Sequence, residues 1–207
     1  MVRTTLFPNN SIVMVREMKN IKIIKTGIDV SSIQKQIDQY PEDWGNVGHK
    51  SPDNSVIKTN ILQLIIGGVS KHDEFIGNSE ISLPTESIKR HTEIQHFLAS
   101  NFKSVCRCAF FKTPIGQVTG HHYDIGKYYV NKDRYHLSIS GTYSYTVWDN
   151  PFYPPLKEND GVKETIDVEP GTLFWFNNKK NHMAINTSQK ERIAFIFDTP
   201  KGSLKEI

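Results

Sequence analysis

The chain has 207 residues, a length that suits one domain or one domain with an extension. Its 25 Lys and Arg exceed its 22 Asp and Glu by only three, and it contains no basic stripe or run of five like charges, so nothing in its charge points to nucleic acid. We expect no signal peptide, because a Pro and two Asn interrupt residues 1–19 before an apolar run develops, and no membrane span, because the longest apolar stretch is 61–69.

The first hundred residues mix strands and helices. Strands are predicted at 11–15, 21–28 and 56–66, and helices at 29–40 and 84–102. In the first helix Ile33 and Ile37 recur at helical spacing, and in the second Thr85 before Glu86 gives an N-terminal capping signal. His91 and His96 fall on the second helix five positions apart, so they share no face, and we expect both to lie on the surface.

From residue 104 the pattern changes to short alternating runs separated by turn signals. The runs cover 104–113, 116–124, 134–141, 142–149, 162–168, 171–177, 182–188 and 191–199. Eight short strands with brief connections predict a mainly β double-sheet jelly roll with the helices packed outside it. We therefore expect one domain over 1–207, in which residues 1–103 pack on a core formed by residues 104–200.

The two cysteines, Cys106 and Cys108, are separated by one residue and would point to the same face of a strand. This spacing fits neither a disulfide nor a zinc finger. We interpret them as buried free thiols in a reducing, cytoplasmic setting, with a redox role as the less favoured alternative.

A metal site is predicted around the segment VTGHHYD. If 116–124 is a strand, His122 and Asp124 project to one face, and His121 and Tyr123 to the other. His182, in a strand 58 residues after Asp124, is the candidate third ligand. Two imidazoles and one carboxylate on one side of an ion leave three positions open and favour ferrous iron for oxygen chemistry.

Cationic side chains accompany this triad. Arg192 lies ten residues after His182, and we expect it on the adjacent antiparallel strand, where it would grip the distal carboxylate of an acid bound to the metal. Arg134 and His136 lie two apart, hence on one face of another strand. The pair His122-x-Asp124 occurs by chance in many proteins, but four segments that converge on one pocket are poorly explained by chance.

Residues 105–200 resemble the aspartyl/asparaginyl β-hydroxylase family of Fe(II)- and 2-oxoglutarate-dependent oxygenases, a branch of the cupin-like, double-stranded β-helix superfamily. The matching pieces are PIGQVTGHHYDIGKYY, DRYH, EPGTLFWFNNKKNHMAINTS and ERIAFIFD. The resemblance implies His122, Asp124 and His182 as iron ligands, Arg192 as the residue that grips 2-oxoglutarate, and Arg134 and His136 as residues that help to hold it. The animal enzymes that give the family its name lack the carboxylate ligand, so with Asp124 this chain is more similar to bacterial small-molecule and proline-hydroxylating relatives.

The activity implied by this resemblance is a dioxygenase reaction with Fe(II), 2-oxoglutarate and O₂, in which an amino-acid side chain is hydroxylated and succinate and CO₂ are released. The substrate would be a residue in a protein or peptide, or a small amino-acid-like molecule, with no nucleic-acid or membrane partner. Three alternatives are a non-catalytic cupin-like module that binds a metal or ligand, a zinc or manganese hydrolase or isomerase, and an oxygenase that acts on another small molecule. The second has no use for Arg192.

Further residues are candidates for the surroundings of the site. Five aromatic residues are candidates for the cavity wall, with core packing preferred for Phe174: Tyr128, Tyr129, Trp148, Phe174 and Trp175. Asn186 would orient substrate or ligands, His121 is interpreted as a structural histidine, and Asp133 would pair with Arg134 or cap a turn. The segment 40–55 is a candidate lid, with Trp44 as its aromatic residue of interest, and His49 and His72 are expected to be exposed.

Overall fold

The computed structural model describes the backbone of residues 3–6, 12–15, 18–50, 56–68, 78–149 and 162–206, and the side chains of 18–45, 60–68, 78–149 and 162–206. The elements before residue 104 are β1 (Arg3–Leu6), β2 (Ile12–Val15), β3 (Ile21–Lys25), α1 (Ser31–Gln39), the 3₁₀ helix η1 (Pro41–Asp43), β4 (Gly45–Lys50), β5 (Val56–Gly67), β6 (Ser82–Pro84), the 3₁₀ helix η3 (Glu86–Arg90) and α2 (Thr92–Asn101). The later elements are β7 (Cys108–Thr113), β8 (Val118–His122), α3 (Lys127–Val130), β9 (Lys132–Ser140), β10 (Tyr143–Trp148), β11 (Lys163–Val168), β12 (Leu173–Phe176), β13 (His182–Asn186) and β14 (Arg192–Pro200).

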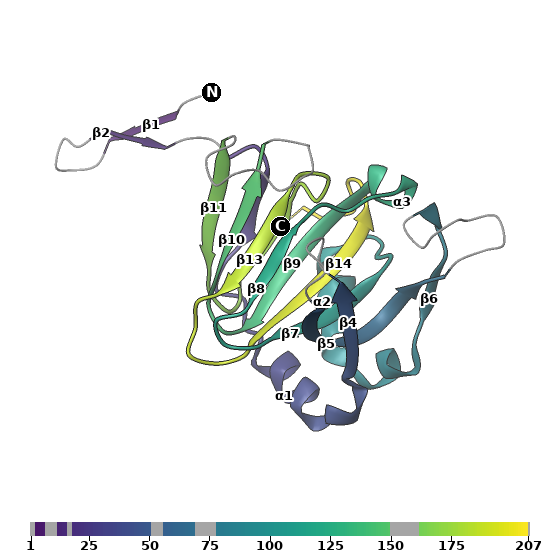
Figure 1. Ribbon diagram of the computed structural model, residues 1–207. Helices are drawn as coiled ribbons and strands as arrows, with labels where there is room; N and C mark the ends of the chain where they lie inside the picture. The colour runs from purple at the N-terminus through teal and green to yellow at the C-terminus, as the bar shows by residue number, and fades with distance from the viewer. Residues whose placement is uncertain are drawn as a thin grey trace.

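Two facing antiparallel sheets form the body of the described structure (Figure 1). The smaller sheet has the strand order β11-β10-β13-β8, and the larger has the order β3-β12-β9-β14-β7-β5-β4, with β6 paired to β5. From β7 to β14 the chain alternates between the sheets, except that β10 and β11 are neighbours in the smaller one. All eight predicted runs form strands, so the expected jelly roll is confirmed.

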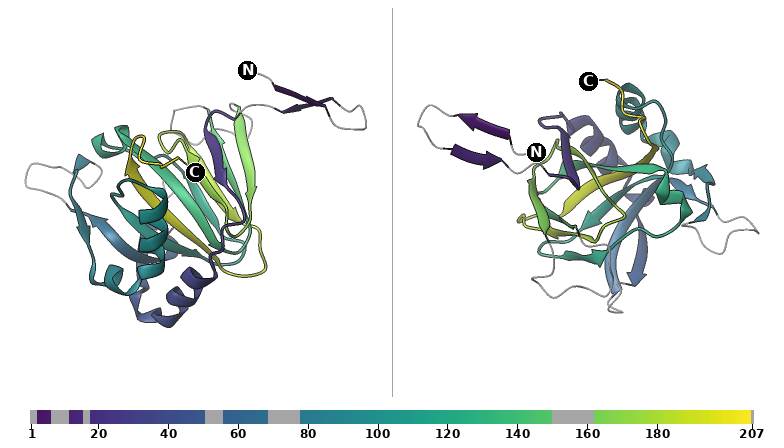
Figure 2. Two further views of the ribbon diagram at one scale, coloured as in Figure 1. Left: turned by 180° about the vertical axis from the view of Figure 1, so that it is seen from behind. Right: turned by 90° about the horizontal axis from the view of Figure 1, so that it is seen from above.

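Alternation along the strands separates two apolar cores. On β14, Phe195 and Phe197 face outward and pack with Ile33 and Leu98 of the helices, and Figure 2 shows α1 and α2 against this outer face of the larger sheet. The second core includes Ile21 and eight further residues between the two sheets: Tyr143, Tyr145, Val147, Ile166, Val168, Phe174, Phe176 and Ala184. The inner face of the larger sheet is thereby directed toward the smaller sheet.

Strands from the N-terminal half extend the larger sheet at both ends of its core. β3 pairs with β12, and β5 pairs with β7. The carboxylate of Glu164 on β11 accepts hydrogen bonds from the backbone N–H groups of Lys19, Asn20 and Ile21, at 2.9, 2.8 and 3.1 Å. This fixes the point at which β3 enters the fold, since three donors are satisfied by one side chain.

The second predicted helix differs from expectation. It divides into η3 and α2 around His91, and Thr85 caps neither, because its Oγ1 donates instead to the backbone O of Gln63 at 2.7 Å. His96 is exposed as expected, but His91 is buried, with its Nε2 2.9 Å from Oδ2 of Asp43, so its surface assignment was wrong. The acid that reaches it comes from η1, a partner that the spacing of histidines on one helix does not reveal.

The candidate lid lies in part outside the described residues, as do His72 and the side chain of His49. Trp44 is described, and it packs against the helix-side core with the Nζ of Lys112 4.5 Å from its ring centroid. Trp44 is therefore a packing residue directly before β4. In the described part of the chain, no helix has the length and apolar character needed to span a membrane.

Candidate metal centre

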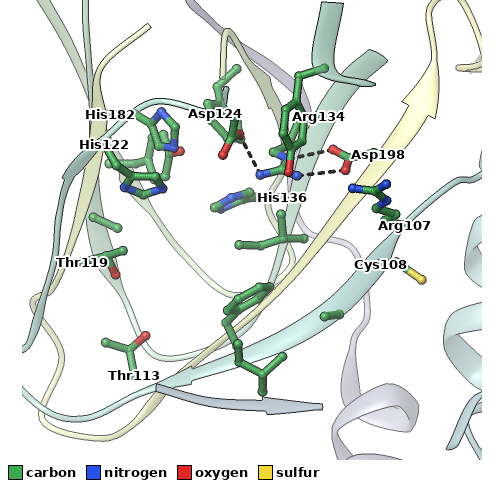
Figure 3. Close-up of a pocket in the computed structure, with 18 of the residues that line it drawn as sticks. Arg107, Cys108, Thr113, Thr119, His122, Asp124, Arg134, His136, His182 and Asp198 are labelled. Carbon is green, nitrogen blue, oxygen red and sulfur yellow. Dashed lines mark hydrogen bonds and ion pairs between the residues drawn. The ribbon is translucent and has the colours of Figure 1, made fainter. Parts of the chain in front are cut away.

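The three predicted ligands lie close together at one end of the neighbouring strands β8 and β13 in the smaller sheet. His122 ends β8, His182 begins β13, and the two are directly paired across these strands. One possible ligand atom each from His122, Asp124 and His182 lies within 4.8 Å of the other two, close enough to share an ion (Figure 3). Their assignment as iron ligands stays a prediction, and the geometry is compatible with it.

The two imidazoles are oriented by backbone carbonyls. Nδ1 of His122 lies 2.8 Å from the O of Gly120, and Nδ1 of His182 lies 2.9 Å from the O of Lys180. A carbonyl only accepts, so each Nδ1 carries the proton and each Nε2 keeps a free lone pair. Burial, and then the neighbouring His122, lower the pKa of His182 to about 3, so its ring is neutral at physiological pH. The ring of His182 is therefore in the form that binds a metal.

Asp124 reaches the site from beyond the strand. β8 spans Val118–His122, so the predicted strand over 116–124 is two residues too long at each end. Asp124 is held by its own N–H, which donates to the O of Asn178 at 2.9 Å. Its Oδ2 accepts from Nη1 of Arg134 at 2.7 Å and from Nδ2 of Asn178 at 2.8 Å. Burial opposes ionisation, but Arg134 and the two site histidines outweigh it, and the pKa of Asp124 is lowered. The carboxylate is therefore ionised, and its Oδ1 accepts no hydrogen bond from the described residues.

Arg134 joins this carboxylate to a second one. Its Nε and Nη2 donate to the two oxygens of Asp198 at 2.7 and 2.8 Å, while Cζ lies 4.9 Å from the ring centroid of Tyr129. Burial disfavours the cation, but Asp124 and Asp198 raise the pKa of Arg134 well above its usual value. Asp198 was not predicted, although an acid inside the apolar run AFIFD is the signal that marks it. The role of Arg134 in holding a co-substrate stays a prediction.

His136 projects from β9 into the same interior. Its ring centroid lies 5.0 Å from those of Tyr145, Phe174 and Phe176, and its Nδ1 has no hydrogen-bond partner among the described residues. Burial, followed by Arg192 and Arg134, lowers its pKa well below the usual value, so it is neutral. As expected from their spacing, Arg134 and His136 line one cavity.

Arg192 arrives from the opposite sheet. We expected it on a strand adjacent to β13, and this was wrong: β13 pairs with β10 and β8, whereas β14 pairs with β7 and β9. The chain crosses between the sheets after β13, so Arg192 faces the triad across the interior. It is 3% exposed, its Cζ lies 3.8 Å from the ring centroid of Tyr143, and no acidic side chain of the described residues pairs with it.

One cavity of about 720 Å³ is lined by the His122, Asp124 and His182 triad and by Arg134, His136, Arg192 and Asp198. Of the five predicted wall residues only Tyr129 lines it, together with Tyr145 and Phe176, which were missed. The other four pack elsewhere. Phe174 belongs to the core between the sheets, Tyr128 is buried, Trp148 packs on His121 at 4.4 Å between ring centroids, and the Nε1 of Trp175 donates to Oδ1 of Asp133 at 3.0 Å.

That last bond also corrects Asp133, which accepts from Trp175 and neither pairs with Arg134 nor caps the turn. Asn186 has a structural role, because its Nδ2 donates to the backbone O of Thr113, Pro114 and Lys190 at 3.1, 2.9 and 3.0 Å. His121 faces away from the triad toward Trp148, as its interpretation as a structural histidine required.

Comparison with solved structures identifies the architecture. An oxidoreductase of the 2OG-Fe(II) oxygenase family from Burkholderia pseudomallei superimposes with a TM-score of 0.58 at 10% identity, over 84% of this chain and 80% of that one. The chain is a double-stranded β-helix.

Two further matches to this β-helix are weaker. A predicted oxalate decarboxylase from Thermotoga maritima matches with a TM-score of 0.40 at 11% identity, over 76% of this chain and 91% of that one. The CENP-C cupin domain of Drosophila melanogaster matches with a TM-score of 0.34 at 8% identity, over 47% of this chain and 58% of that one. Neither score is high enough to support an argument. No protein-family model matches this sequence, and no curated protein sequence is similar to it.

Proposed function

We propose that the protein is an Fe(II)- and 2-oxoglutarate-dependent oxygenase that hydroxylates an amino-acid side chain, either in a protein or peptide or in a free amino acid. The observation that carries this proposal is Arg192, a buried cation without an acidic partner among the described residues, in the same cavity as the His122, Asp124 and His182 triad.

A buried charge without a counter-ion is costly, so Arg192 points to an anionic ligand. A divalent metal alone adds positive charge to the cavity and leaves this cost uncompensated. An acid that chelates the metal with one end and presents a second carboxylate to Arg192 satisfies both requirements, and 2-oxoglutarate is such an acid. A zinc hydrolase or isomerase gives Arg192 no comparable task.

The surrounding groups fit a bound dicarboxylate. Nδ1 of His136 and the hydroxyl of Tyr145 are buried without hydrogen-bond partners among the described residues, and Tyr143 lies beside Ser138 and Arg192, which are its neighbours for polar contact. Unsatisfied polar atoms are rare in folded proteins, and those of His136 and Tyr145 indicate a polar ligand or ordered water. These donors are suited to carboxylate oxygens, and Tyr145 and Phe176 beside them exclude bulk water.

The chain's own residues would hold and orient the reactants. His122, Asp124 and His182 bind iron from one side, and Arg134 with Asn178 keeps the carboxylate of Asp124 in place. Iron, 2-oxoglutarate and O₂, when bound together, would supply the oxidising power for hydroxylation of a C–H bond, with O₂ as the oxidant. The assignment to the aspartyl/asparaginyl β-hydroxylase family, which the sequence motifs support, and a cytoplasmic location, which the two free cysteines support, are parts of this proposal.

Metal and co-substrate binding test the proposal directly. Purified protein with Fe(II) and 2-oxoglutarate under anaerobic conditions should develop a weak visible absorption band, and His182→Ala should abolish it. Arg192→Met should weaken 2-oxoglutarate binding about tenfold or more by calorimetry, with metal content unchanged. Lys190→Met, at an exposed cation two residues earlier, is the matched control.

The anchor role of Arg192, the oxygenase assignment and the catalytic activity can each be rejected separately. If Arg192→Met binds 2-oxoglutarate as tightly as the wild type, the anchor is misassigned. If the wild type binds metal but no 2-oxoglutarate, the oxygenase proposal is wrong. Binding without any succinate formation in air, with candidate amino acids and peptides present, would instead favour the non-catalytic cupin-like module.

A further inference from the structure

The cavity continues beyond the triad along β7 and β5, to Arg107. Arg107 directly precedes β7, and its backbone O accepts a hydrogen bond from the N–H of Asp198 at 2.8 Å. On its other side Asp198 pairs with Arg134 of β9. Arg107, Asp198 and Arg134 therefore lie in one row across the sheet, and the backbones of the two arginines are about 10 Å apart. Figure 3 shows Asp198 between the two arginines, with the triad on the far side of Arg134.

The guanidinium of Arg107 is held in place but has no counter-ion among the residues that the structure describes on either side of 69–77. Its Cζ lies 3.8 Å from the ring centroid of Tyr128, and its Nη2 donates to the backbone O of Ser79 at 2.6 Å. Nε is buried without a partner among the described residues. Asp198, the nearest acid along the row, has both oxygens occupied by Arg134.

The charges of the cavity wall therefore do not balance. Three arginines and two aspartates line it, and Arg134 binds both aspartates, which leaves Arg107 and Arg192 without acidic partners in the part of the chain that the structure describes. One five-carbon acid cannot serve both. Arg107 lies beside Asp198, and Asp198 is six residues from Arg192 along β14, a distance of about 20 Å. A five-carbon acid spans only about 6 Å. A 2-oxoglutarate anchored at Arg192 leaves Arg107 free for a second anion.

The wall near Arg107 is mostly aliphatic. Ile65 and Ile66, which directly precede Gly67 on β5, line the cavity together with Ile196 of β14, and Gln63 of β5 is the polar residue among them. Gly67 provides the space for the guanidinium, because a Cβ at this position would lie 2.4 Å from Cζ of Arg107. A ligand here meets one cation beside an apolar surface.

We propose that Arg107 is the substrate-binding residue, and that the substrate is a small carboxylic acid with an aliphatic body, a class that includes free aliphatic amino acids. The carboxylate binds the free N–H groups of Arg107, and the body lies along β5 and β7 toward the triad. This inference rests on the proposed function, of which it specifies the substrate class.

Saturation-transfer NMR tests the site without turnover and suits weak ligands. The protein is loaded with Zn(II) as a diamagnetic substitute for iron and with saturating 2-oxoglutarate, and hexanoate is titrated against hexanamide, which lacks the charge. Hexanoate should bind the wild type, and Arg107→Met should weaken this binding about tenfold or more. Arg107→Lys, which keeps the charge but loses the fork, should fall between, and hexanamide should bind all forms equally weakly.

Gly67→Ala provides a second variant in which the arginine is retained. The added methyl group displaces only the flexible end of Arg107, so folding should be preserved, as thermal unfolding can verify, while hexanoate binding weakens. Hexanoate binding that is equal in the wild type and Arg107→Met, or absent from the wild type, would overturn the inference. So would binding that Arg192→Met alone removes.

The same spectra separate this inference from the proposed function. Resonances of 2-oxoglutarate report its own binding in each sample. Loss of that signal in the wild type, with hexanoate binding still dependent on Arg107, would reject the oxygenase and keep the carboxylate site. The reverse result would reject the carboxylate site and keep 2-oxoglutarate as a ligand.

Discussion

Arg134 donates from Nη1 to Oδ2 of Asp124 at 2.7 Å, which places a buried cation directly behind the carboxylate of the candidate metal centre. Nε and Nη2 of the same guanidinium donate to Asp198, whose side chain is 1% exposed. The carboxylate of Asp124 is thus fixed by a residue that need not touch the metal. Outer partners of this kind commonly change metal affinity by 10- to 100-fold, as a rough range.

Replacing Arg134 by Gln should therefore weaken both metal binding and the fold. We expect metal affinity to fall about 10- to 100-fold and the free energy of unfolding to fall by about 3–5 kcal/mol, because two buried carboxylates lose their cation. Metal titration and urea unfolding measure the two effects. Arg134→Lys keeps the charge but not the fork, and it should lie between. Unchanged metal affinity in Arg134→Gln would contradict this positioning role.

Adjacent histidines on β8 provide a matched pair for the metal site. His122 faces Asp124 and His182, whereas the ring of His121 packs on Trp148. His122→Ala should lower bound metal from one equivalent to near zero, and His121→Ala should leave it unchanged, as measured by atomic emission after dialysis. Equal loss of metal in both variants would show that the strand face does not decide ligation.

Asp43 should make stability depend on acid. Burial raises its pKa, but hydrogen bonds from Arg90, His91 and Ser87 outweigh burial, so the folded pKa lies below the unfolded value of about 3.9. The ionised form stabilises the fold above that value, and this contribution is lost as pH falls through the folded pKa. Asp43→Asn should lower the free energy of unfolding by about 2–3 kcal/mol at pH 7. Urea unfolding from pH 7 to 3 should show the difference closing below about pH 4, and a constant difference would contradict it.

The two thiols should differ in reactivity. Both are free; burial raises the pKa of Cys108 to about 12 and also raises that of the half-buried Cys106. Since the thiolate is the reactive form, iodoacetamide at pH 8 should modify Cys106 slowly and Cys108 only after unfolding, as followed by peptide mass spectrometry. Rapid modification of Cys108 in the folded protein would show that its part of the cavity opens to reagents.

Sequence periodicity predicted what depends on neighbours along the chain. The alternation in β7 to β14 identified every core strand, and the spacing of Ile33 and Ile37 identified the buried face of α1. Contacts between segments that are distant in the sequence could not be predicted from this periodicity. His91 is buried because η1 brings Asp43 to it, and Thr85 bonds to β5 rather than to a helix.

The site shows the same division. His122, Asp124 and His182 were grouped correctly, yet the reason given for Asp124 was wrong, because it lies past the end of β8 and is held by Asn178. Arg192 was expected beside β13 but lies on the opposite sheet, since sequence order does not reveal when a chain changes sheets. Asn178, the partner of Asp124, has no motif of its own, and Asp198, the partner of Arg134, is marked only by its place in the apolar run AFIFD.

The pairing of β3 with β12 and of β5 with β7 has a practical meaning for truncation. A fragment that begins at residue 104 would leave the outer N–H and C=O groups of both β12 and β7 bare, and bare strand edges recruit other chains. β3 and β5 thus shield these two edges of the double-stranded β-helix from self-association.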